Sequence, residues 1–174
     1  KKYVKHLNFW KEHLGQNSDS FVLPGNRKNG NVVKEEQMVF ALDNVCRELL
    51  HRYTDRRPFE RFVIWTSVIS YVLSRYTGEQ KINILTPLLK AKVEREMWEK
   101  MVPITLDLSS PKTIKQHIID TDRSLKAFYQ FQNFPLDLVT EENHHGMAMD
   151  DFSNVLISHD SLHDTVPEDL KRPG

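Results

Sequence analysis

Two short segments near the end of the chain are rich in histidine and aspartate. In the first, His144 and His145 come shortly before Asp150 and Asp151. An imidazole beside a carboxylate is a common pair for proton transfer. Adjacent side chains of an extended segment point to opposite sides, however, so two neighbouring histidines rarely act on one substrate. We therefore expect a solvated polar loop here, and the residue types alone identify no catalytic side chain.

The second segment carries His159, Asp160, His163 and Asp164. Imidazole and carboxylate groups are suitable ligands for several divalent metals. The segment lacks the further ligands that catalytic metal sites need. We therefore expect no metal site and interpret these residues as the beginning of a solvated, irregular tail over residues 161–174.

Cysteine, serine and glycine patterns give no stronger indication of an active site. Cys46 is the only cysteine, which excludes an internal disulfide and a cysteine-based zinc or iron–sulfur site. It stands beside Val45 and Leu49 on an apolar helix face, where a thiol is usually buried for packing. The sequence has neither the Gly-x-Ser-x-Gly motif of serine hydrolases nor a glycine-rich phosphate-binding loop.

Charge and hydropathy exclude other classes of protein. The 174 residues include 24 Lys and Arg and 24 Asp and Glu, so the formal net charge is zero, which argues against a nucleic-acid binder with a broad basic face. The longest apolar run, residues 62–73, is too short to span a bilayer. We expect a cytoplasmic protein with no nucleic-acid or membrane partner. Because the first residue is Lys1 rather than Met, we also expect a piece of a longer protein.

The first half of the chain has three helical patterns and one alternating pattern. Apolar residues recur at helical spacing over residues 2–14, and residues 15–31 have the composition of a linker. Residues 37–42 alternate like a half-buried strand, and Asp43 is a suitable N-cap for a helix ending near Tyr53. A long helix follows over residues 58–77, with Pro58 in its first turn. Since Val68 and Val72 add a second apolar face, we expect this helix to be central to the core.

The second half alternates strands with one more helix. Gly78 is placed to end the long helix. Strands are predicted over residues 81–85, 101–108 and 152–158, and a helix over residues 113–131. Ile114 is the first of the apolar positions of that helix. Strands that alternate with long helices predict an α/β fold, a layered sheet with helices packed on it.

Ser-Arg-Tyr-Thr-Gly occurs at residues 74–78 and is followed by Lys-Ile-Asn-Ile-Leu-Thr-Pro at residues 81–87. These two segments resemble the condensation domains of nonribosomal peptide synthetases, in which a helix ending in such a turn leads into a strand closed by Gly-Thr-Pro. Here Leu85 replaces the glycine. Weaker likenesses occur in the family's order at residues 9–14, 23–24, 102–109, 129–139 and 151–157.

The resemblance implies a fold like that of chloramphenicol acetyltransferase, in which two similar α/β halves form a V around a tunnel. Residues 1–174 would be a partial condensation domain, its C-terminal subdomain. The family's catalytic His-His-x-x-x-Asp-Gly motif lies in the first half, upstream of this chain. The pair His144 and His145 does not match this motif. Four residues, rather than three, separate His145 from Asp150, and the residue after Asp150 is not glycine. We therefore assign no catalytic residue, and expect the chain by itself not to catalyse condensation.

The same resemblance implies partners and a role. Condensation domains join aminoacyl and peptidyl groups that carrier proteins hold as thioesters on phosphopantetheine arms. This half would supply a tunnel wall and a docking face, beside the missing first half and neighbouring synthetase domains. No cofactor would be bound directly apart from the carrier's phosphopantetheine arm. A local basic cluster could face an acidic carrier or the phosphate of that arm, and the alternative is a solvated helix end; its members are Arg52, Arg56, Arg57 and Arg61.

Two other functions remain open from the sequence. One is a condensation-like interaction or scaffold module that has lost catalysis, since Leu85, Lys100 and Phe131 depart from the family pattern. The other is an unrelated α/β binding domain. A His-His-x-x-x-Asp-Gly motif upstream in the parent protein would distinguish an active domain from a scaffold.

Overall fold

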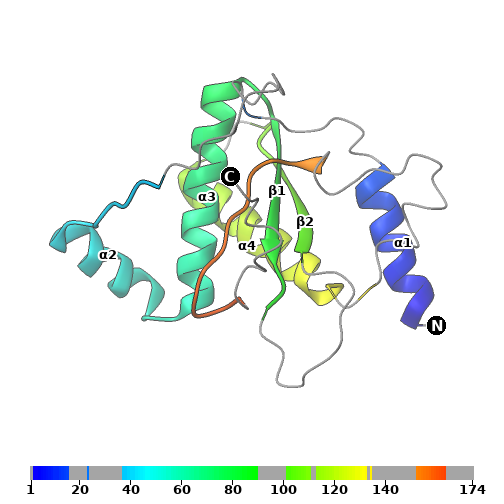
Figure 1. Cartoon of the computed structure of the whole chain (residues 1–174), viewed down its shortest axis with the longest axis horizontal. Helices are drawn as coiled ribbons and strands as arrows, with labels where there is room; N and C mark the ends of the chain where they lie inside the picture. The colour runs from blue at the N-terminus through cyan, green and yellow to red at the C-terminus, as the bar shows by residue number, and fades with distance from the viewer. Residues whose placement is uncertain are drawn as a thin grey trace.

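The computed structural model describes residues 2–15, 23, 37–89, 101–110, 113–132, 134 and 152–163. Within these residues the chain forms helices and a pair of strands (Figure 1). In chain order they are α1 (Lys2–Gly15), α2 (Asn44–Thr54), α3 (Pro58–Thr77), β1 (Lys81–Pro87), β2 (Met101–Asp107) and α4 (Ile114–Gln130). The predicted helices and the first two predicted strands of the second half are confirmed. Most of the predicted linker and of the predicted tail lies outside the described residues.

The strands β1 and β2 pair antiparallel, with Lys81 opposite Asp107 and Ile84 opposite Ile104. The segment predicted as a third strand, residues 152–158, runs along the other edge of β1, where it forms a short parallel bridge rather than a full strand, and Ser153 Oγ donates to the carbonyl of Asn83 at 2.7 Å. The N–H of Leu85 donates to the carbonyl of Val155 at 2.8 Å, and the N–H of Ile157 donates to the carbonyl of Leu85 at 2.9 Å. Burial is nearly continuous along β1 and β2, which is typical of strands covered on both faces.

Local signals in the sequence fix the ends of α3 and α4. Pro58 occupies the first turn of α3, where the N–H that it lacks would have no helical partner. Gly78 closes the helix in the left-handed conformation, with φ of 81°, and donates its N–H to the carbonyl of Ser74. Thr113 caps α4 by accepting the N–H of Gln116 at 3.1 Å. The two helices pack on each other, and α3 also contacts β1 while α4 contacts β2.

The helix α3 is not central to the core as predicted. Its inward face is buried through Phe62, Val63 and Thr66, whereas Val68 and Val72 on the second face are exposed. The described residues pack against only one side of the helix. Ile114, one of the apolar positions of α4, is 80% exposed in the first turn of the helix.

The helix α1 is anchored to the end of α4 by aromatic side chains. Trp10 is almost fully buried and donates its indole N–H to the carbonyl of Phe131 at 3.1 Å. Phe9 stacks on the ring of Phe131, with the centroids 4.1 Å apart. An amphipathic stripe in the sequence thus becomes a docked helix at the opposite side of the molecule from α2 (Figure 1).

The segment before α2 differs from the prediction. Residues 37–42 form no strand, and Phe40 is 81% exposed, because no described segment lies beside them to pair with their backbone. Asp43 is the N-cap, as predicted, and accepts the N–H of Cys46 at 2.8 Å. The thiol of Cys46 is exposed rather than buried, since α2 projects away from the sheet (Figure 1).

The described elements form an α/β fold in which helices pack on a small sheet, and this part of the prediction is confirmed. None of the described helices is both long and apolar enough to cross a membrane.

Candidate functional site

The four arginines of the predicted docking cluster lie around the turn between α2 and α3. Arg52 is in the last turn of α2, Arg56 and Arg57 are in the connection, and Arg61 is in the first turn of α3. The connection is sharp because Asp55 and Arg56 both adopt positive φ, 48° and 56°. The structure therefore brings the four residues to one helix–helix corner.

The four side chains have different surroundings. Arg61 is partly buried and donates from Nη2 to the carbonyl of Arg56 at 2.7 Å, so it stabilises the corner. Arg57 is exposed and forms an ion pair with Glu60 at 3.0 Å. Arg52 and Arg56 are also exposed, and neither has an acidic partner among the described residues. The positive charge available to a partner at this corner is mainly that of Arg52 and Arg56.

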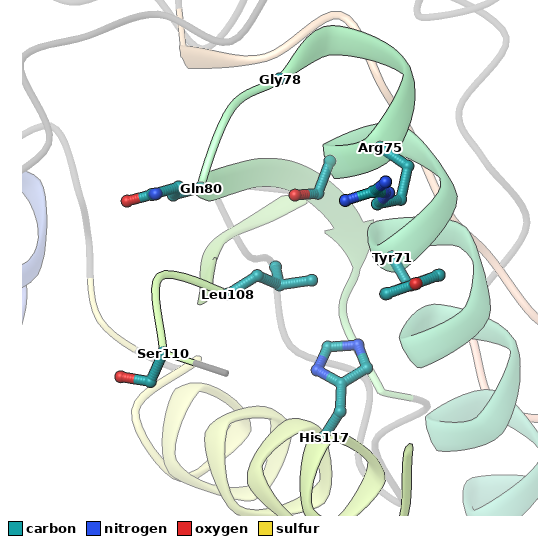
Figure 2. Close-up of a pocket in the computed structure, with 8 residues that line it drawn as sticks. Tyr71, Arg75, Gly78, Gln80, Leu108, Ser110 and His117 are labelled. Carbon is teal, nitrogen blue, oxygen red and sulfur yellow. The ribbon is translucent and has the colours of Figure 1, made fainter. Parts of the chain in front are cut away.

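A cavity of about 490 Å³ lies where the C-terminal end of α3 meets the start of β1, the end of β2 and the first turns of α4 (Figure 2). Its lining combines one cation, one imidazole, a phenol ring and small polar groups. The residues are Tyr71, Ser74, Arg75, Gly78, Gln80, Leu108, Ser110 and His117. Sequence patterns did not indicate this site, because its members are spread over almost fifty residues and form no motif.

His117 is the most constrained side chain of the cavity. It is only 9% exposed, and its Nε2 lies 2.9 Å from the carbonyl oxygen of Ser67 and 3.3 Å from Oγ of Ser70. A carbonyl oxygen can only accept, so Nε2 carries the hydrogen. In the neutral ring, Nδ1 is then an acceptor, and no described residue donates to it. Figure 2 shows the ring at one side of the cavity and Arg75 at the opposite side.

A second polar cluster is buried between β1, α4 and residues 159–163. The hydroxyl of Tyr129 lies 2.8 Å from Nε2 of His163 and 2.8 Å from Oγ1 of Thr86. The N–H of His159 donates to Nδ1 of His163 at 2.8 Å. The proton of the neutral His163 ring is therefore on Nε2 and is donated to Tyr129. Burial raises the pKa of Tyr129, which keeps its hydroxyl protonated and able to donate to Thr86.

This cluster corrects the expectation for the second histidine segment. His163 is buried, not part of a solvated tail, because it packs edge-on against Phe62 and bonds to Tyr129. His159 accepts the N–H of Ser161 through Nδ1. Among the described residues, no three histidine, cysteine or acidic side chains come together to hold a metal ion. Asp164 and the other histidine segment, with His144, His145, Asp150 and Asp151, lie outside the described residues.

Three solved structures show the same fold. The starter condensation domain of rhizomide synthetase RzmA, in complex with C8-CoA and Leu-SNAC, has a TM-score of 0.61 and 13% identity over 90% of this chain and 35% of that one. The first condensation domain of the calcium-dependent antibiotic synthetase, in complex with a substrate analogue, has a TM-score of 0.64 and 12% identity over 90% and 36%. The X-domain in complex with OxyB from teicoplanin biosynthesis has a TM-score of 0.59 and 17% identity over 79% and 32%.

The chain thus spans about a third of the length of these structures. No curated protein matches the sequence. The family model of the condensation domain matches residues 1–161, which is most of the chain. This match and the shared fold confirm the resemblance found in the motifs: the chain belongs to the condensation domain family.

Proposed function

We propose that this chain is the C-terminal subdomain of a nonribosomal peptide synthetase condensation domain, with residues 1–174 forming one partial domain. The main support for this proposal is the extent of the structural match. The match covers 90% of this chain but only 35–36% of each of the two solved condensation domains. The order of the motifs at residues 74–87, 102–109 and 129–139 supports placement in the second half. The missing first half is then its principal partner.

In the parent domain, the acceptor amine attacks the thioester carbon of the donor, so a C–N bond forms, the C–S bond breaks and the carrier's thiol leaves. The histidine motif that assists this step belongs to the first half. This chain contributes positioning, because holding two tethered substrates together supplies much of the rate of such a reaction. It does so as one wall of the tunnel and as a docking face, acting on phosphopantetheine-bound groups in the cytoplasm beside other synthetase domains.

We place the docking face at the corner between α2 and α3. Arg52 and Arg56 are exposed there without acidic partners among the described residues, and Arg57 is only partly neutralised by Glu60. Charged side chains at such a surface mainly speed the encounter with an oppositely charged partner and select its orientation. Arg61, which bonds to the carbonyl of Arg56, keeps the corner in shape.

The test is an NMR titration of the ¹⁵N-labelled chain with acyl-loaded holo carrier proteins and with the unloaded apo forms. We expect localised shifts that include the amides of residues 50–61 and that strengthen with the loaded arm. The double variant Arg52→Glu with Arg56→Glu should weaken binding by about tenfold or more. Its matched control, Lys115→Glu with Arg123→Glu, makes the same change of charge on exposed positions of α4 and should leave binding unchanged.

If both double variants weaken carrier binding equally, the effect comes from the net charge of the chain, and the corner between α2 and α3 is not the docking face. A folded chain that gives no shifts with any carrier would contradict the docking role. Coexpression with a first half that carries His-His-x-x-x-Asp-Gly tests the subdomain assignment separately, because only a true complement should yield a stable complex that joins two loaded carriers.

A second candidate is an interaction module without catalysis. The solved X-domain that shares this fold is in complex with the protein OxyB, so this fold is compatible with recruitment of a separate protein. For this chain, that role would give carrier shifts that do not depend on loading and no product from the reconstituted pair.

A further inference from the structure

We propose that the cavity between α3 and α4 binds a small hydroxyaryl carboxylate, with its carboxylate at Arg75 and its hydroxyl at Nδ1 of His117. The site lies at the C-terminal end of α3, whereas the docking corner lies at its N-terminal end, and the inference does not depend on the condensation function.

Arg75 supplies the anion-binding end. It is exposed in the last turn of α3, lines the cavity, and has no acidic partner among the described residues. Figure 2 shows its guanidinium at one side of the cavity, across from the ring of His117. A guanidinium presents two parallel N–H groups that match the two oxygens of a carboxylate. One carboxylate at this end would therefore pair with a cation that none of the described acidic residues neutralises.

His117 supplies the opposite end. Its side chain is about nine-tenths buried, and its orientation is fixed because Nε2 must donate to Ser67. The acceptor Nδ1 receives no hydrogen bond from a described residue and is not sealed from solvent, so it is open to a donor that enters the cavity. A ligand hydroxyl at this position would supply the missing donor. An ammonium or amide N–H would also fit the atom, but the neighbouring ring of Tyr71 and the side chain of Leu108 favour a phenol.

The remaining walls define the body of the ligand. Leu108 and Tyr71 lie on the two sides between Arg75 and His117 in Figure 2. An aliphatic side chain facing an aromatic ring favours a flat, apolar group between them. A volume of about 490 Å³ is within the range of small-molecule sites. The apolar part of the lining is limited to Leu108 and the ring of Tyr71, and most of the other residues are polar. A ligand with a carboxylate at one end, a hydroxyl at the other and one aromatic ring between them matches this lining.

The experiment titrates the ¹⁵N-labelled chain with 4-hydroxyphenylacetate, with phenylacetate, which lacks the hydroxyl, and with tyramine, which lacks the carboxylate. We expect saturable shifts at residues 75, 78, 80, 108 and 117 with the first probe. Loss of the hydroxyl should weaken binding about fivefold to tenfold, as expected for one hydrogen bond. Loss of the carboxylate should abolish saturable binding.

Two variants assign the ends of the ligand. His117→Gln retains an N–H that can donate to Ser67 but has no Nδ1, so in this variant the two acids should bind with affinities within about twofold. Arg75→Gln should weaken 4-hydroxyphenylacetate by about tenfold. Arg123→Gln, an exposed arginine on α4, is the matched control and should change nothing. Retention of the amide spectrum outside the cavity establishes that each variant is folded.

Four results would overturn the proposal. They are the absence of saturable shifts below about 10 mM, shifts centred on the docking corner, an equal benefit of the hydroxyl in wild type and His117→Gln, and unchanged affinity in Arg75→Gln. None of them bears on carrier binding, so the failure of this inference is distinguishable from the failure of the proposed function.

Discussion

The hydroxyl of Tyr129 lies 2.8 Å from Nε2 of His163, and this contact joins α4 to the last described segment of the chain. Thr86 joins the same hydroxyl to β1. Each of the three side chains is at least nine-tenths buried, so each needs the others as hydrogen-bond partners. A histidine that a solvated tail would leave in water thus becomes a fixed part of the interior.

Replacement of Tyr129 by Phe removes the central hydroxyl and leaves the Nε2–H of His163 without its close acceptor. We expect the free energy of unfolding to fall by about 1–3 kcal/mol, the usual cost of leaving a buried polar group unsatisfied. Urea denaturation followed by circular dichroism measures it. Tyr53→Phe is the control, because Tyr53 is 76% exposed and should change stability by less than about 0.5 kcal/mol. Equal effects of the two substitutions would show that the cluster adds no stability.

Leu125 and Ile114 form a matched pair of aliphatic positions on α4. Leu125 is fully buried, so Leu125→Ala should cost about 2–5 kcal/mol through lost burial and the cavity that remains. Ile114 is 80% exposed, and Ile114→Ala should stay within about 0.5 kcal/mol. Thermal and urea unfolding of both variants provide the comparison. A large loss for Ile114→Ala would mean that this end of α4 is covered in solution.

Gly78 tests the backbone requirement at the end of α3. Its φ of 81° is costly for a residue with a Cβ, yet an added Cβ would meet no atom within 4 Å. Gly78→Ala should therefore cost about 1–2 kcal/mol from the backbone alone. Gly78→Asn should cost less, since asparagine tolerates this conformation better. If the two variants unfold at the same urea concentration, the left-handed conformation at residue 78 does not set the cost of the substitution.

The sequence predicted the elements whose signals are local. Pro58 and Gly78 mark the ends of α3, and the capping residue Asp43 marks the start of α2. Each signal acts within one turn of backbone, so it does not depend on tertiary contacts. The family resemblance is local in the same sense, because residues 74–87, which carry most of it, form one nearly continuous stretch of the chain.

Burial and the candidate cavity could not be predicted in this way. The helical periodicity placed Ile114 and Val68 on apolar helix faces, yet both side chains are exposed. Which face of a helix is buried depends on elements that are distant in the sequence. Residues 37–42 alternate like a strand, yet the described residues offer them no partner. Arg75 and His117 come together only because α3 and α4 pack on one another.

Cys46 follows a correctly predicted N-cap, Asp43, but is exposed where the sequence predicted burial, so its reactivity can be measured. Asp43 caps α2 by accepting the backbone N–H of Cys46, and hydrogen bonding and negative charge from the same carboxylate raise the pKa of the Cys46 thiol. The thiol is exposed, but the fraction of reactive thiolate at neutral pH is reduced. Asp43→Asn keeps a good N-cap and removes the charge, so the pKa of Cys46 should fall and alkylation by iodoacetamide should become faster. The pH–rate profile of alkylation should move to lower pH.

The control is Asp55→Asn, which removes one acidic charge at the other end of α2, where asparagine also tolerates the positive φ of 48°. Its alkylation profile should match that of the wild-type chain. Circular dichroism should show equal helix content in all three proteins, because a frayed α2 would itself alter access to the thiol. If Asp43→Asn leaves the pH–rate profile in place, the carboxylate does not control the thiol. The N-cap of α2 would then act on the backbone alone.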